Sequence, residues 1–116
     1  LHEITRLGVA AGGSQRTFSG LAGLGDLVLT CTGGLSRNRR TGVELAEGKS
    51  LDEIRADTSM VAEGVRNSRT VQALARRRSV EMPITDQMVA VLYEGKPVRQ
   101  AVDELMSRDL KAESEL

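Results

Sequence analysis

The chain has 116 residues, enough for one domain with a single modest hydrophobic core. Apolar residues make up 40% of it and aromatic residues only 2%, which is typical of packed helices and disfavours a β-sandwich. Sixteen basic residues balance sixteen acidic ones, so the charge offers no general surface for nucleic acid or an anionic membrane.

The rare residue types narrow the chemistry further. With one histidine, His2, and one cysteine, Cys31, the sequence excludes an intramolecular disulfide and a zinc site of Cys and His ligands. We therefore expect no metal site, and a Cys31 buried as a small apolar residue. No apolar run approaches the roughly 20 residues of a membrane span and no secretion signal opens the chain, so we expect a cytoplasmic protein without membrane insertion.

The N-terminal half predicts helices separated by glycines. Apolar residues at helical spacing predict a helix over 1–11, which Gly12 ends because glycine enters left-handed conformations easily. Nothing caps its start, so we interpret it as the second half of a helix whose beginning is missing. The period of the glycine-spaced apolar stretch 18–32 does not decide between helix and strand. Ser36 is the expected N-cap of a helix through about Ala46.

The C-terminal half carries clearer helix signals. Ser50 and Glu53 have capping-box spacing and predict a short helix to about Ala56, followed by a longer helix over 62–78. Proline favours a first helical turn, so two more helices begin near Pro83 and Pro97. Their expected buried faces are Ile84, Met88, Val91 and Leu92, and then Val98, Ala101, Val102, Leu105 and Met106. No segment alternates with period two over more than a few residues, so the predicted fold is all-α with about six packed helices.

Two features between Gly20 and Gly42 suit a small phosphorylated molecule that bears hydroxyls. Asp26 is an isolated carboxylate among glycines and leucines, and a buried charge needs a partner such as an arginine or a bound polyol. Ser36, Arg37 and Asn38 open a helix and offer hydroxyl, guanidinium, amide and backbone N–H groups to a phosphate. The structural alternatives are a simple N-cap at Asp26 and a solvated basic first turn after Ser36. The neighbouring Arg39 and Arg40 are expected to be solvated or locally paired.

Four sequence blocks resemble, in the same order, the substrate domain of bacterial NAD(P)-dependent glycerol-3-phosphate dehydrogenase. They are GLAGLGDLVLTCT with SRNRRTG, MVAEGVRNSRTVQALA, VEMPITDQMVAVLYEGK and LMSRDLKAE. The resemblance implies that residues 1–113 form the C-terminal helical substrate-binding domain of a two-domain enzyme like 6-phosphogluconate dehydrogenase, with 114–116 as a tail. It also implies that 18–32 is helical. Because family members are considerably longer, we expect a chain truncated at its N-terminus that lacks the Rossmann domain.

The same resemblance implies a function. The parent enzyme interconverts dihydroxyacetone phosphate and sn-glycerol 3-phosphate with NAD(P)H, which feeds phospholipid synthesis. The matching positions imply substrate contacts at Asp26, Ser36, Arg37 and Asn38, and contacts to NAD or NADP at Arg37, Val61 and Glu63. The cofactor is bound mainly by the missing domain. The family's proton-transfer lysine lies farther upstream of Asp26 than this sequence reaches, so no catalytic residue is expected here and the chain alone should be inactive.

Other readings of the sequence stay open. The chain could be a stand-alone, non-catalytic helical module that binds a phosphorylated metabolite or dimerises. It could also belong to a related dehydrogenase for another hydroxy acid, although the Asp26 and SRNR blocks disfavour this. Whether a Rossmann segment precedes the chain in the same gene separates the first reading from the parent enzyme. For that enzyme we expect a homo-oligomer.

Overall fold

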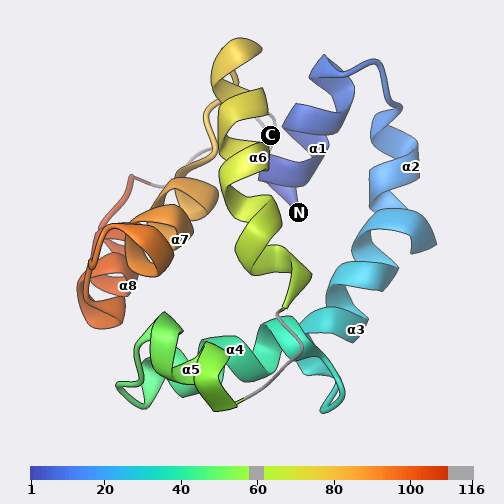
Figure 1. Ribbon diagram of the computed structural model, residues 1–116. Helices are drawn as coiled ribbons and strands as arrows, with labels where there is room; N and C mark the ends of the chain where they lie inside the picture. The colour runs from blue at the N-terminus through green and yellow to red at the C-terminus, as the bar shows by residue number, and fades with distance from the viewer. Residues whose placement is uncertain (58–61, 110–116) are drawn as a thin grey trace.

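The computed structural model describes residues 1–57 and 62–109, and within these ranges it contains helices and no strand. The all-α prediction is confirmed, and the described residues form eight α-helices and one π-helical turn in place of about six helices (Figure 1). In chain order they are α1 (His2–Ala10), α2 (Gln15–Ser19), the π turn η1 (Leu21–Gly25), α3 (Asp26–Thr32), α4 (Arg37–Ala46), α5 (Leu51–Asp57), α6 (Glu63–Arg77), α7 (Pro83–Tyr93) and α8 (Val98–Met106). None of these helices combines the length and apolar character needed to span a bilayer.

The predicted helix boundaries rest on local hydrogen bonds that the structure confirms. Ser36 caps α4, since its Oγ accepts from Arg39 N at 3.2 Å. At the start of α5 the capping box is complete: Ser50 N donates to Glu53 Oε2 at 2.7 Å, and Glu53 N donates to Ser50 Oγ at 3.2 Å. Pro83 occupies the first turn of α7, where its missing N–H leaves no bond unmade.

The apolar stretch 18–32 is helical, as the family resemblance implied, but it is not one helix. Gly20 is extended, with φ −95° and ψ −158°, and separates α2 from the π turn that leads into α3. A Cβ at Gly23 would lie 2.0 Å from the carbonyl oxygen of Phe18. Glycine is therefore required at this position to let η1 fold back against α2.

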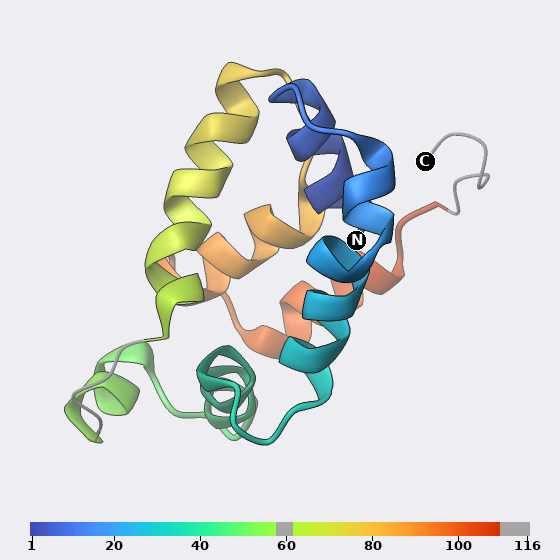
Figure 2. The same cartoon turned by 90° about the vertical axis from the view of Figure 1, so that its right-hand side faces the viewer.

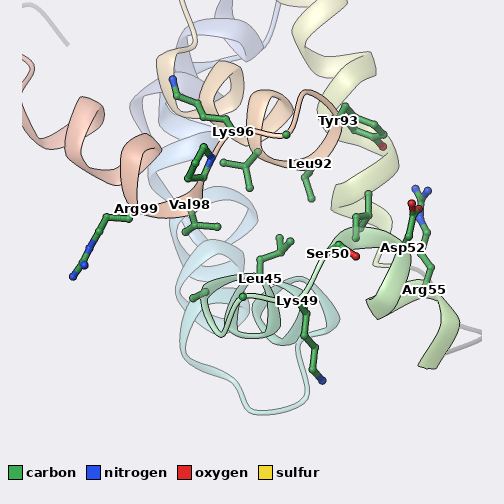
Figure 3. A pocket seen from close by; sticks show the side chains of 16 residues that line it. Leu45, Lys49, Ser50, Asp52, Arg55, Leu92, Tyr93, Lys96, Val98 and Arg99 are labelled. Carbon is green, nitrogen blue, oxygen red and sulfur yellow. The ribbon is translucent and has the colours of Figure 1, made fainter.

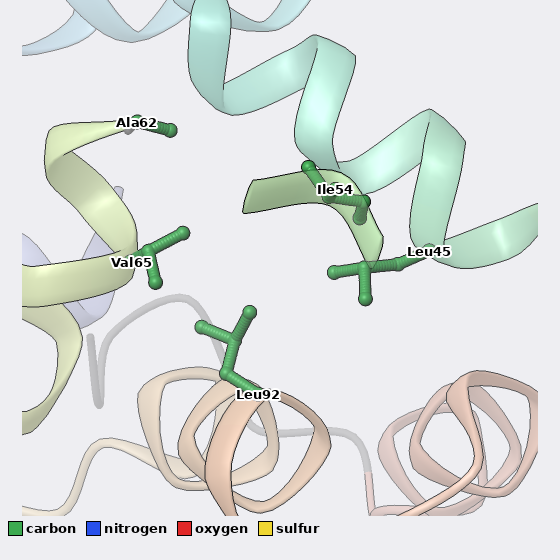
Figure 4. Packing of buried hydrophobic residues seen from close by; sticks show 5 residues of the cluster. All are labelled: Leu45, Ile54, Ala62, Val65 and Leu92. Carbon is green, nitrogen blue, oxygen red and sulfur yellow. The ribbon is translucent and has the colours of Figure 1, made fainter. Parts of the chain in front are cut away.

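The helices are arranged around α6, the longest of them. Figures 1 and 2 show α7 and α8 along one side of α6, α1 to α3 on another, and α4 with α5 across its N-terminal end. Helix α4 contacts α3, α5, α6 and α8, so it connects the two sides of the molecule. The core lies where α4 to α7 meet, and it consists of the converging side chains of Leu45, Ile54, Ala62, Val65 and Leu92 (Figure 4).

Several burial predictions are wrong, although the helices that carry them are right. In α7 the buried residues are Val89 and Leu92, whereas Ile84 and Met88 are 52% and 39% exposed. In α8 Ala101 is buried, but Val102 and Met106 are exposed. The exposed residues of each helix lie on the part of the apolar stripe that no described neighbour covers.

Cys31 is also exposed, against the prediction that it is buried. It lies in the last turn of α3, a helix of seven residues that packs mainly against η1 and α4 within the described chain. Composition favours burial for an unpaired cysteine, but the single side on which α3 packs decides the outcome.

Helix α1 is anchored by polar contacts to the segment that joins α6 to α7 and to the start of α7. The buried carboxylate of Glu3 accepts hydrogen bonds from Ile84 N, Thr85 N and Thr85 Oγ1 at the start of α7. Arg6 Nη2 donates to the carbonyl of Glu81 at 2.9 Å, and Arg78 Nη1 donates to the carbonyl of Ala10 at 2.6 Å. These bonds fix α1 against the connection between α6 and α7.

Candidate functional site

The start of α4 has the character of an anion site. Its first turn contains no acidic residue, and Ser36 Oγ satisfies only one of its free N–H groups. Arg37 is exposed, and its guanidinium forms no hydrogen bond or ion pair with any residue of 1–57 or 62–109. Arg40, by contrast, pairs with Glu44 at 3.4 Å, which confirms the expected local pairing. A free guanidinium beside helical N–H groups is suited to a phosphate.

Asn38 joins this turn to the start of α6. Its Oδ1 accepts a hydrogen bond from Gly64 N at 3.0 Å, across 26 residues of sequence. The N-cap residue of α6 is Ala62, which has no side chain that could accept this bond. Asn38 therefore caps α6 from α4, and its Nδ2 makes no hydrogen bond with the described residues.

Glu63 is the first residue of α6 and directly precedes Gly64, the residue that donates to Asn38. Its carboxylate is exposed and makes no ion pair within the described ranges. The structure thus brings one predicted cofactor residue next to the predicted substrate residue Asn38 through the neighbouring Gly64. Val61, the other predicted cofactor residue, lies outside the described residues.

Asp26 does not match the buried carboxylate that the sequence suggested. It lies in the first turn of α3, is exposed, and has no partner within the described part of the chain. The π turn η1 continues into α3 through Gly25, which is also helical, so Asp26 lies within a continuous helical segment and its carboxylate needs no buried partner because it is exposed to solvent. Asp26 is accessible to a ligand, but no bond connects it to Arg37 or Asn38.

An apolar pocket of about 330 Å³ opens beside Asn38 and Gly64, between α4, α6 and α7. Side chains that line it include Thr41, Leu45, Val71, Ile84, Met88 and Leu92. The spacing of Asn38, Thr41 and Leu45 at i, i+3 and i+7 places them on one face of α4 and is the sequence signal for this surface. The exposure of Ile84 and Met88 follows from their position in this opening.

A second pocket of about 680 Å³ lies between the α4–α5 and α7–α8 connections (Figure 3). Lys49, Lys96 and Arg99 line it, but Figure 3 shows their side chains pointing away from one another. Lys49 is 3.9 Å from Glu44, and Lys96 bonds to Glu104. The cations therefore do not converge on a common anion.

Glu104 is the described residue whose acidity the fold changes most. It accepts hydrogen bonds from Lys96 Nζ, from Gln100 Nε2 at 2.9 Å and from Gln87 Nε2 at 2.8 Å. These bonds lower the pKa of the Glu104 carboxyl to about 2, and the bond from Lys96 has the largest effect. This cluster links α8 to α7 and lies apart from the start of α4.

Comparison with known proteins gives consistent matches. Residues 1–103 match the family model described as NAD-dependent glycerol-3-phosphate dehydrogenase C-terminus. The chain is 58% identical over 113 residues to glycerol-3-phosphate dehydrogenase (NAD(P)+) of Solidesulfovibrio magneticus, covering 97% of this chain and 34% of that protein. With the enzyme of the same name from Syntrophobacter fumaroxidans it shares 56% identity over 116 residues, covering 100% and 34%.

A solved structure agrees in fold as well as in sequence. The crystal structure of glycerol-3-phosphate dehydrogenase from Coxiella burnetii superposes with a TM-score of 0.88 at 47% identity. The match covers 92% of this chain and 33% of that one. The chain therefore spans about a third of the length of the relatives it matches.

Proposed function

Because this chain belongs to the family of NAD-dependent glycerol-3-phosphate dehydrogenase C-terminal domains, we propose that it is the substrate-binding portion of such an enzyme. The enzyme interconverts dihydroxyacetone phosphate and sn-glycerol 3-phosphate with NAD(P)H and so feeds phospholipid synthesis. The observation that carries the proposal is Arg37: a guanidinium at a helix start, exposed and without a partner among the described residues.

Each proposed substrate residue offers a group that suits one part of the molecule. Arg37 can hold two phosphate oxygens with its planar fork, while the first-turn N–H groups of α4 face the same charge. Asn38 keeps a free Nδ2 to donate to a phosphate oxygen. The Asp26 carboxylate accepts hydrogen bonds from hydroxyl groups, and Ser36 can still donate its hydroxyl proton while it caps α4.

The residues also fit a nicotinamide nucleotide. Glu63 presents an exposed, acceptor-only carboxylate, which suits ribose hydroxyls or a carboxamide, and the charge of Arg37 suits a nucleotide phosphate. When bound, NAD(P)H supplies the hydride, and this chain's residues bind and orient the two molecules. Lys49 and Lys96 pair with Glu44 and Glu104, away from the start of α4, and Lys111 lies outside the described residues. Because the family's proton-transfer lysine lies upstream of the stretch that this chain matches, we assign proton transfer to a lysine outside this chain.

The proposal extends to the setting of the enzyme. We propose that it works in the cytoplasm as a homo-oligomer, and that the 116-residue chain alone is inactive because neither the proton-transfer lysine nor the cofactor domain is among its residues. Exposed apolar side chains on η1, α3 and the turn after α3 support an assembly, since large exposed apolar groups usually mark an interaction surface.

The role of Arg37 can be tested in a chimera. Residues 1–113 replace the matching third of the Solidesulfovibrio magneticus enzyme, and NADH oxidation is followed with dihydroxyacetone phosphate. Arg37→Lys keeps the charge but loses the bidentate fork, so kcat/KM should fall at least about tenfold, or roughly 1.4 kcal/mol. Arg77→Lys, at an exposed position in the last turn of α6, is the control and should leave kcat/KM unchanged. Wild-type kinetics in Arg37→Lys would refute the assignment.

A further inference from the structure

The contact between Asn38 and Gly64 leaves no room for a side chain at position 64. A Cβ at Gly64 would lie 2.6 Å from Asn38 Oδ1, 3.0 Å from its Cγ and 3.2 Å from its Nδ2. No side chain other than hydrogen fits without moving the amide. Gly64 is the second residue of α6, and the space left by its missing Cβ is taken up by the Asn38 amide.

The contact also lies between the two halves of the proposed site. Asn38 follows Arg37 in the first turn of α4, and Gly64 follows Glu63 in the first turn of α6. Since Ala62 cannot cap α6, the Asn38 amide is the side chain that fixes where this helix begins. Together with the packing of Leu45 against Ala62 and Val65, this hydrogen bond holds Glu63 in a defined position relative to Arg37.

We propose that Asn38 is a positioning residue that holds Glu63 in register with the substrate-binding turn, and that Gly64 is glycine to admit its side chain. The inference rests on the proposed function and deepens it. Asn38 has two separable parts: Oδ1 orders the start of α6, and Nδ2, which makes no hydrogen bond with the described residues, can donate to the phosphorylated substrate.

Three variants of the chimera separate these parts. Gly64→Ala displaces the Asn38 amide and should raise KM for both NADH and dihydroxyacetone phosphate by two- to tenfold, the range for one lost hydrogen bond. Asn38→Asp keeps an acceptor for Gly64 N but removes the donor and adds a negative charge. It should raise KM for dihydroxyacetone phosphate about tenfold or more and leave KM for NADH within about twofold. Gly42→Ala is the matched helical control, because the Cβ that alanine adds there would have nothing within 4 Å, and it should change neither KM.

Amide exchange in the 116-residue chain gives a readout that is independent of activity. Gly64 N–H should exchange two- to tenfold faster in Asn38→Ala than in wild type, and at the wild-type rate in Asn38→Asp. Equal exchange in all three chains would overturn the capping role. Gly64→Ala with the kinetics of Gly42→Ala, while Arg37→Lys still lowers kcat/KM, would overturn the positioning role and leave the proposed function standing. A folded chimera without turnover would instead overturn the proposed function.

Discussion

The carboxylate of Glu3 should be among the most important single side chains for the stability of the chain. It is 8% exposed and accepts three hydrogen bonds, from Ile84 N at 2.5 Å and from Thr85 N and Oγ1 at 3.1 Å each. The N-cap residue of α7 is Met82, which has no side-chain acceptor, so Glu3 caps α7 from α1. At about 1 kcal/mol for each bond, Glu3→Ala should lower the free energy of unfolding by about 3 kcal/mol.

Urea unfolding of the 116-residue chain followed by circular dichroism measures this difference. For a domain of this size a loss of about 3 kcal/mol corresponds to a melting temperature lowered by about 10 °C. Glu3→Gln keeps one acceptor oxygen but places an amide N–H group next to backbone N–H groups that also donate. It should therefore lower the free energy of unfolding by about half as much as Glu3→Ala. Glu47→Ala, at an exposed position after α4, is the control and should stay within about 0.5 kcal/mol of wild type. A Glu3→Ala chain as stable as Glu47→Ala would refute the capping argument.

Two further predictions concern acid stability and self-association. The pKa of Glu104 is about 2 in the folded chain and lower than in the unfolded chain, so its stabilising contribution is complete above about pH 4.5 and is lost as the pH falls toward 2. In Glu104→Gln the free energy of unfolding should therefore depend less on pH in that window than in wild type. The same pH dependence in both proteins would show that the cluster does not stabilise the fold. Leu35 is 99% exposed and Leu21 and Leu29 are also exposed, so the chain should self-associate at high micromolar concentration. Light scattering that finds only monomer would contradict this.

The elements that could be predicted from sequence are those fixed by neighbouring residues. Ser36, the Ser50–Glu53 pair and Pro83 act within one helical turn, and each begins a helix where expected. The family blocks identified the fold because their order extends along almost the whole chain. Burial was harder to predict, since Ile84 and Met88 share an apolar stripe with Leu92 but face an opening between helices.

The contacts that the sequence did not reveal are long-range caps. Glu3 reaches α7 across about 80 residues, and Asn38 reaches Gly64 across 26. No spacing rule connects such pairs, because the packing of whole helices brings them together. Met82 and Ala62, which precede α7 and α6, make no side-chain cap bond of their own, and this was the available signal. At Asp26 the sequence suggested a buried acid, whereas the structure has it exposed at the start of α3.

Reconstitution of activity tests the central claim most directly. NADH oxidation with dihydroxyacetone phosphate is compared among three proteins: the 116-residue chain, the Solidesulfovibrio magneticus enzyme without its matching third, and the chimera that joins this chain to the remainder. We predict that the chimera turns over substrate while the two separate parts do not exceed the rate without enzyme. A correctly folded chimera with no turnover, or activity in either part alone, would contradict the account.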